Sequence, residues 1–238
     1  MKLDILVFAA HPDDAELSCA GTIYSHVLQG KKVGIVDFTL GELGTRGTPE
    51  IRAKEAAASA EILKLSVREN LQFRDGFFKN DEAHQLEVVK AIRKYEPSVI
   101  LANAITDRHP DHGRAAALVT EACFLSGLKQ VKTYDRDEKQ LPWRPKAVYH
   151  YIQSNYIKPD FIVDVSDAWE TKLASIRAFK SQFFDPDSKE PETYISSPAF
   201  MEFITARAKE FGHSIGARYG EGFTIERNIG VKNLFNLL

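Results

Sequence analysis

Short apolar runs alternate with segments of helical period through the first hundred residues. Between the runs, apolar side chains recur every three or four positions, so each intervening segment presents one face to a sheet. This alternation is typical of βαβ units around a parallel sheet. The strands that it predicts are Leu3–Ala10, Val33–Thr39, Asn70–Phe73 and Val99–Ala104.

The second half of the chain continues the same kind of pattern with fewer regular repeats. It predicts a helix from Pro110 to about Leu125, and the mixed stretch from Lys129 to Pro145 is expected to be a surface excursion. The remaining elements expected are strands at Ala147–Gln153 and Phe161–Val165, a helix with an apolar stripe from Trp169 to Phe183, and a last helix around Phe200–Phe211. We therefore predict an α/β protein with a Rossmann-like, mostly parallel sheet, helices on both faces and a single domain over residues 1–238.

Composition narrows the class of protein. The 31 basic and 33 acidic side chains nearly cancel and are interspersed, which disfavours a nucleic-acid partner. Cys19 and Cys123 lie in apolar helical patterns without a CxxC pairing, as expected of reduced thiols in a cytoplasmic protein. No apolar stretch approaches the roughly 20 residues that span a bilayer, and the opening run lacks the features of a signal peptide. We expect no membrane partner.

The first candidate for chemistry is the segment Ala10–Glu16, AHPDDAE, at the junction of the first strand and first helix. Ligands of open α/β sheets bind at the carboxyl ends of the strands, where helix N-termini add partial positive charge. Asp13 and Asp14 also fit a plainer interpretation, as acids of the first helical turn that complement the helix dipole. This motif alone leaves both interpretations open.

A second cluster, Asp107–Gly113 or DRHPDHG, follows the strand Val99–Ala104 and again begins a helix. Two His/Asp clusters are thus expected at one edge of one sheet. Catalytic zinc is commonly held by three nitrogen and oxygen ligands, with a fourth position for water. The set that we predict is His11, Asp14 and His112, although such ligands also accept other divalent first-row metals.

The remaining side chains of the two clusters suit the other steps of a hydrolysis. Asp13 is left as an unligated carboxylate that can act as general base on a water molecule and return the proton to an amine. His109 is expected at the rim, where it can stabilise an oxyanion. Asp111 is expected to orient a ligand histidine by accepting its second N–H.

Together, AHPDDAE and HPDHG resemble the PIG-L-type family of zinc-dependent N-acetylglucosamine deacetylases, also called LmbE-like, and the resemblance runs over essentially the whole chain. It implies zinc, the ligands His11, Asp14 and His112, and Asp13 as the base. It also implies a homo-oligomer, often a hexamer.

A finer resemblance lies in residues 39–55, TLGELGTRGTPEIRAKE, which are similar to the branch that deacetylates N-acetylglucosaminyl-malate in bacillithiol synthesis. The resemblance to the family as a whole implies a catalytic or substrate-binding role for Arg52 and a substrate-binding role for Tyr194. Arg46 and Arg108 are further candidates to bind substrate carboxylates or hydroxyls, with a surface role as the alternative for each. Glu221 lies between two glycines, and a plain turn also explains that segment.

Three other functions remain open from the sequence. The same metal chemistry serves an amidase of a thiol conjugate of the sugar or a deacetylase of another N-acetylated sugar. A nucleotide-binding α/β module without hydrolytic activity is an alternative of another class. Against that module, the first strand–helix turn carries two acids in place of GxGxxG, and these would repel a pyrophosphate.

Overall fold

A central sheet organises the chain in the computed structural model, which describes residues 1–184 and 188–237. Within these residues the sheet has seven strands in the order β3-β2-β1-β4-β7-β9-β8. The strands from β3 to β7 run parallel, whereas β9 is antiparallel to both of its neighbours. Their bounds are β1 Ile5–Ala9, β2 Val33–Thr39, β3 Val67–Phe73, β4 Val99–Ala102, β7 Ala147–Tyr151, β8 Phe161–Asp164 and β9 Gly220–Ile225.

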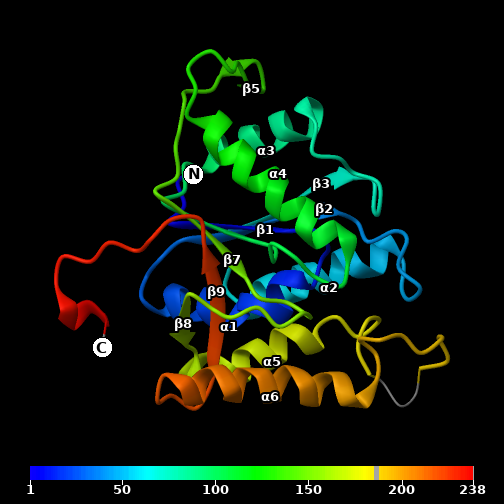
Figure 1. Ribbon diagram of the computed structural model, residues 1–238. Helices are drawn as coiled ribbons and strands as arrows, with labels where there is room; N and C mark the ends of the chain where they lie inside the picture. The colour runs from blue at the N-terminus through cyan, green and yellow to red at the C-terminus, as the bar shows by residue number, and fades with distance from the viewer. Residues whose placement is uncertain (185–187, 238) are drawn as a thin grey trace.

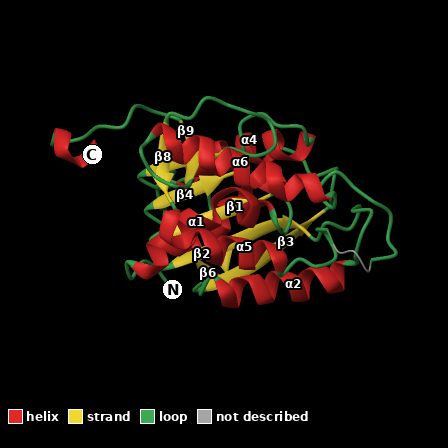
Figure 2. Cartoon of the chain, turned by 90° about the horizontal axis from the view of Figure 1, so that it is seen from below, coloured by secondary structure: helices red, strands yellow, loops and turns green. Residues whose placement is uncertain are grey.

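Helices cover both faces of this sheet, as the sequence predicts. Figure 1 shows α3 and α4 on one side and α1, α2 and α5 on the other, with α6 outside α5. Figure 2 shows the α1, α2 and α5 side, with the strands behind these helices. The bounds are α1 Asp14–Leu28, α2 Pro49–Ile62, α3 Glu82–Tyr95, α4 Pro110–Ser126, α5 Trp169–Arg177 and α6 Pro198–Ser214, with short 3₁₀ turns at Ser166–Ala168 and Leu234–Leu237.

The two largest clusters of the hydrophobic core lie one on each face of the sheet, and every residue of β1 is buried between them. Leu6 and Phe8 contribute to the cluster under α3 and α4, while Ile5 and Val7 contribute to the cluster under α1. Alternate strand residues point to opposite faces, so a strand that is buried on both sides shows a continuous apolar run. This explains why the first strand is easily recognised in the sequence.

The sheet order places the two chemical motifs next to each other. β1 lies between β2 and β4, and the chain turns to opposite sides of the sheet after these central strands. Such a switch point opens a crevice at the carboxyl ends of the strands. The segments that follow β1 and β4 both end there, one leading into α1 and the other into α4.

Several elements differ from the sequence prediction. The helix expected from Trp169 to Phe183 ends at Arg177, and Phe179 and Phe183 pack into the core from the segment that follows it. The strand expected at Asn70–Phe73 begins earlier, at Val67.

The stretch 129–145 contains a small hairpin, β5 Tyr134–Asp135 with β6 Glu138–Lys139. The segment around Glu221 is not a turn but the sheet strand β9, whose glycines allow close approach of α6. A Cβ on Gly222 would lie only 2.8 Å from Cε2 of Phe211, so any other residue at this position would force the phenylalanine ring to move. The two glycines interrupt the apolar alternation that marks a strand.

The sheet draws its strands from nearly the whole chain, from Ile5 to Ile225. The expectation of one domain over residues 1–238 stays a prediction, which this continuity supports. Among the helices of the described residues, none combines the length and apolar character needed to cross a bilayer.

Candidate metal centre and active site

The β1–α1 loop is shaped to present its acidic side chains. The backbone N–H of His11 donates to Oδ2 of Asp14 at 3.0 Å, which folds the loop back on the start of α1. Asp13 has a φ of 118°, a left-handed conformation that is unfavourable for a residue with a side chain. Backbone strain of this kind occurs at functional sites, where the surrounding structure maintains it.

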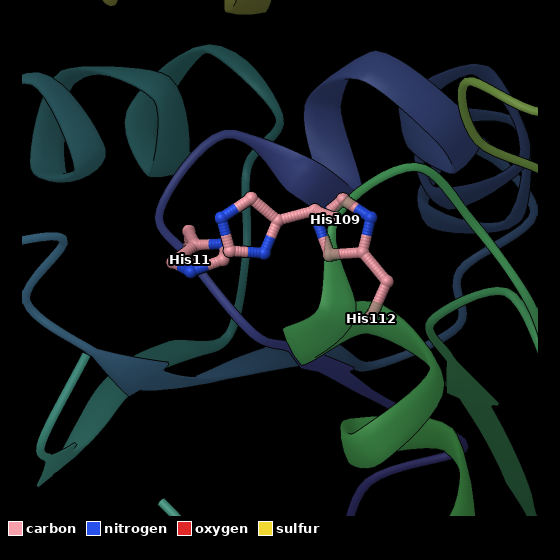
Figure 3. A group of neighbouring side chains, drawn as sticks. All are labelled: His11, His109 and His112. Atoms are coloured by element: carbon pink, nitrogen blue, oxygen red, sulfur yellow. The ribbon is translucent and has the colours of Figure 1, made fainter. Parts of the chain in front are cut away.

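His11, Asp14 and His112 converge at the edge of the sheet. Oδ2 of Asp14 lies 3.5 Å from Nδ1 of His11, and Oδ1 lies 3.0 Å from Nε2 of His112. The two imidazole rings are 5.7 Å apart between centroids. Figure 3 shows the rings of His11, His109 and His112 together where the β1–α1 loop meets the start of α4. The carboxylate of Asp14 therefore bridges two imidazoles that come from distant parts of the chain.

Further carboxylates hold the outer nitrogens of these histidines. Nε2 of His11 lies 3.1 Å from Asp75 and 3.4 Å from Asp111, whereas Nδ1 of His112 lies 2.6 Å from Asp107. Carboxylates on the second ring nitrogen fix the orientation of metal-ligating histidines and raise their basicity. The expected orienting contact of Asp111 is present, but Asp75 is closer to the same nitrogen and no sequence pattern marks it.

Two amides complete the support of Asp14. Nδ2 of Asn103 donates to Oδ2 at 3.0 Å, and Nε2 of Gln153 donates to Oδ1 at 3.0 Å. Asn103 is fully buried and also accepts from the backbone N–H of Ala10, so it ties the ends of β1 and β4 together. Asn103 directly follows β4 and Gln153 comes two residues after β7, and this position after a strand is the one sequence signal that marks them.

The electrostatics of the cluster favour a cation. Burial lowers the pKa of the His112 imidazole, but the carboxylates of Asp14 and Asp107 outweigh burial and raise that pKa to about 9. Burial likewise lowers the pKa of His11, yet hydrogen bonds to three aspartates hold it well above the ordinary value. Negative side chains outnumber positive ones here, so the site stabilises positive charge between its imidazoles.

This donor set fits a divalent metal. Two imidazole nitrogens and one carboxylate oxygen form a usual set of catalytic zinc ligands. Two other sets have ligand atoms within 4.8 Å of one another: His11 with His109 and His112, and His11 with Asp75 and Asp111. We favour Asp14, since its two oxygens face both of the other ligands and its negative charge offsets that of the metal.

His109 is placed to donate a hydrogen bond into the site. It is the N-cap of α4, and its Nδ1 accepts from the backbone N–H of Asp111 at 3.3 Å, so the proton of the neutral ring is on Nε2. Burial, followed by the nearby positive charges of His11 and His112, lowers its pKa. A neutral imidazole with a free Nε2–H can stabilise an oxyanion.

Asp13 is paired with Arg52, the arginine suggested by the resemblance. Nη2 of Arg52 donates to Oδ2 of Asp13 at 2.9 Å and also to the carbonyl oxygen of Pro12. Burial raises the pKa of Asp13 to about 7, against the opposing effect of Arg52. A carboxyl with a pKa near neutrality can both accept and return a proton.

A cavity of about 470 Å³ opens onto these groups. Arg52, Arg108 and His109 line it, as does each of the expected metal ligands. Arg46 and Tyr194 are not among the described lining residues. Arg46 is buried, with Nη2 on Ser188 and Nε near Glu190.

Tyr194 contacts Arg108, which lines the cavity, but is not itself among the described lining residues. Its ring lies 4.5 Å from the guanidinium of Arg108 and packs edge-on against Phe200. With 48% of its surface exposed, it stands outside Arg108 at the rim of the cavity. A role of Tyr194 toward substrate would therefore act through the position of Arg108.

The carboxylate of Asp107, which contacts Nδ1 of His112, allows a first test of the metal centre. Asp107→Asn keeps the size of the side chain but removes the charge that holds Nδ1, so we expect metal affinity to fall by about 10- to 100-fold. Competition with a fluorescent zinc chelator measures this affinity. Asp164→Asn, an exposed carboxylate that contacts Ser166, is the control. An unchanged affinity in Asp107→Asn would show that Asp107 does not support the metal.

Known proteins are similar to this chain in sequence and in fold. The family model for GlcNAc-PI de-N-acetylase, PIG-L, matches residues 6–123. Diacetylchitobiose deacetylase of Thermococcus kodakarensis is 30% identical over 228 residues, which cover 92% of this chain and 81% of the relative. The crystal structure of the conserved protein TT1542 from Thermus thermophilus matches with a TM-score of 0.85 and 34% identity, over 97% of this chain and 98% of that one.

Two more distant relatives have other named reactions or substrates. A probable N-acetyl-α-D-glucosaminyl L-malate deacetylase 2 of Bacillus cereus is 25% identical, over 76% of this chain and 84% of the relative. The 4-oxalmesaconate hydratase of Pseudomonas putida is 27% identical, over 97% and 88%.

Fold and site together define an α/β enzyme of the deacetylase type. The chain belongs to the PIG-L family of deacetylases. This membership confirms the resemblance in AHPDDAE and HPDHG, and it removes the alternative of a nucleotide-binding module.

Proposed function

We propose that the protein is a zinc-dependent hydrolase that removes the N-acetyl group from an N-acetylglucosamine conjugate. The observation that carries the proposal is the placement of Asp14 between His11 and His112, with the unligated Asp13 beside them at one cavity. Relatives named as deacetylases of N-acetylated sugars support the substrate class.

In the proposed reaction, His11, Asp14 and His112 hold the metal ion. When bound, the ion supplies Lewis acidity, which polarises the amide carbonyl and makes water more acidic. Asp13 takes a proton from the attacking water, and the salt bridge with Arg52 keeps its carboxylate directed into the cavity. His109 donates its Nε2–H to the carbonyl oxygen as negative charge develops there. Asp13 then delivers the proton to the departing amine, leaving acetate and a free amino sugar.

The identity of the conjugate is a finer proposal. A malate conjugate needs cations for two carboxylates, and Arg108 lines the cavity within reach of such a group. The second arginine considered from the sequence, Arg46, is engaged by Ser188 and Glu190 instead. The occupied Arg46 weakens the case for N-acetylglucosaminyl-malate and leaves diacetylchitobiose as an equally suitable conjugate.

Amine release from a small panel of substrates tests the proposal. We expect turnover of N-acetylglucosaminyl-malate or diacetylchitobiose to fall to background after dialysis against a chelator and to return when zinc is added. Simple N-acetylglucosamine and a thiol conjugate of the sugar identify the other family reactions. Activity that persists without metal would contradict the proposed mechanism.

A hydratase is the second candidate, because the relative from Pseudomonas putida aligns with nearly the whole chain. Such an enzyme adds water across a carbon–carbon double bond and releases no amine. Loss of the ultraviolet absorbance of an unsaturated tricarboxylate, without amine release from any acetamido sugar, would favour this candidate.

The proposal extends to the location of the protein in the cell and to its oligomeric state. Cys19 and Cys123 are buried free thiols, which supports a reducing, cytoplasmic compartment. A homo-oligomer, with a hexamer as the family expectation, stays a prediction that light scattering in solution checks.

A further inference from the structure

The cavity at the metal centre extends well beyond the expected metal ligands and Asp13. Toward solvent it is bordered by loop residues such as Leu43 and Phe77, which are 59% and 58% exposed. Its inner part is lined by Leu17 of α1, Ile152 after β7, and Ile204, Ala208 and Phe211 of α6. We call this inner part the apolar chamber.

The apolar chamber begins beside the reacting groups. Leu17 follows Asp13 and Asp14 by one helical turn on α1, so its side chain lies next to theirs on the same helix. With its amide at Asp14 and its amine portion toward the exposed loops, a substrate would place its acyl portion toward Leu17 and the apolar chamber.

The chamber is longer than an acetyl group. Its α6 wall runs from Ile204 to Phe211, seven residue steps of about 1.5 Å, or roughly 10 Å. Arg207 also lines the cavity from this stretch, with its guanidinium donating to the carbonyl oxygens of Gln153 and Ser154. The single methyl group of an acetamide contacts only the start of this wall. The remaining apolar surface is suited to a chain of several methylene groups, because each one buried removes apolar area from water.

The far end of the chamber does not suit a sugar ring. Nζ of Lys172 lies 2.6 Å from Oε1 of Glu221, and both residues are buried, each with 3% of its surface exposed. Glu221 also accepts from the backbone N–H groups of Gly21 and Thr22. These polar atoms already have partners within the protein. A hydroxyl placed here would lose its water without gaining comparable hydrogen bonds.

We propose that the enzyme hydrolyses N-acyl amino sugars whose acyl chain is longer than acetyl, with the chain seated in the apolar chamber. The proposal rests on the proposed amide hydrolysis and specifies its substrate. Water adds its oxygen to the acyl carbon, the C–N bond breaks, and a proton moves to nitrogen. The products are a free amino sugar and a short fatty acid.

A chain-length series on the zinc-loaded enzyme tests the proposal. N-acetyl, N-butyryl and N-hexanoyl derivatives of one glucosamine glycoside are compared by amine release. We expect kcat/KM to rise about fourfold for each added methylene until the chamber is filled. Turnover of the acetyl compound without any gain from longer chains overturns the chamber proposal and leaves the deacetylase intact. Failure to release amine from every compound overturns both.

The octyl glycoside of N-acetylglucosamine identifies the other possible source of an apolar group. A gain with this aglycone, but none with the longer acyl groups, would place the apolar group on the amine side and overturn the proposal.

A pair of matched substitutions locates the effect. Ile204→Phe fills the chamber, so the ratio of hexanoyl to acetyl kcat/KM should fall toward one. Ile215→Phe makes the same change at an exposed position after α6 and should leave the ratio as in the wild type. If Ile204→Phe fails to fold, Ile204→Ala removes chain contacts and should lower the ratio several-fold. A wild-type ratio in a folded Ile204 variant overturns the proposal.

Discussion

We expect the substitution Asp13→Asn to lower the rate of amide hydrolysis by about 10²- to 10⁴-fold, the usual contribution of a general acid–base group. Asparagine has nearly the same shape but cannot accept a proton from water. Because Asp13 faces Arg52 and not the imidazole nitrogens of the ligand set, we expect the metal content to stay at the wild-type level. Steady-state amine release and metal analysis of the purified variant measure the two effects.

The same substitution also removes the charge partner of Arg52, so stability must be followed separately. Arg52 is buried, and loss of an ionic hydrogen bond there costs about 1–3 kcal/mol. Asp81→Asn is the matched control, since Asp81 is likewise the residue before a helix, at the start of α3. Activity within about threefold of wild type in a folded, metal-loaded Asp13→Asn protein would assign the base to another group.

The proposed metal ligands are recognisable in the sequence because strand topology does most of the positioning. Parallel strands end at a common edge, so His11 after β1 and His112 after β4 meet once these strands are neighbours. Local spacing then places Asp14 beside His11, three residues away. Strand positions and short spacings can both be identified in the sequence. The same strand pattern is what predicts the fold class correctly.

Asp75 illustrates what such patterns miss. It reaches Nε2 of His11 from the loop between β3 and α3, across a sequence separation of 64 residues. Asp75 comes two residues after the end of β3, but it stands alone there, with no histidine or second acid beside it to form a motif. Only the packing of that loop against the N-terminus of α4, where Gly76 donates to Asp111, brings the carboxylate to the histidine.

Arg46 and Glu221 also show that local sequence does not report contacts with distant segments. Arg46 has the chemistry of a substrate-binding residue, but Glu190 and Ser188 occupy its guanidinium. Glu221 sits between glycines in a segment that also fits a turn, yet it is buried in β9 and paired with Lys172. In both cases the partner comes from a segment more than 40 residues away, which local periodicity does not report.

His112→Ala tests the convergence of the two motifs on one metal ion. The substitution removes the nitrogen that lies 3.0 Å from Asp14, so the site keeps one imidazole and one carboxylate as ligands. Loss of an orienting carboxylate alone typically costs 10- to 100-fold in affinity, and loss of a ligand is expected to exceed about 100-fold. Zinc stoichiometry after gel filtration should therefore drop well below one, with amine release at background.

His84→Ala is a close control for this variant. Nδ1 of His84 lies 2.6 Å from Asp81, the same separation as Nδ1 of His112 from Asp107, but its pair belongs to the start of α3 and its ring does not line the cavity. Both variants lose an imidazole bound to an aspartate, and only one should lose metal. Equal zinc content in the two proteins would mean that His112 is not a ligand, and the set His11, Asp14 and His112 would have to be abandoned, because two of its members alone do not form a catalytic zinc site.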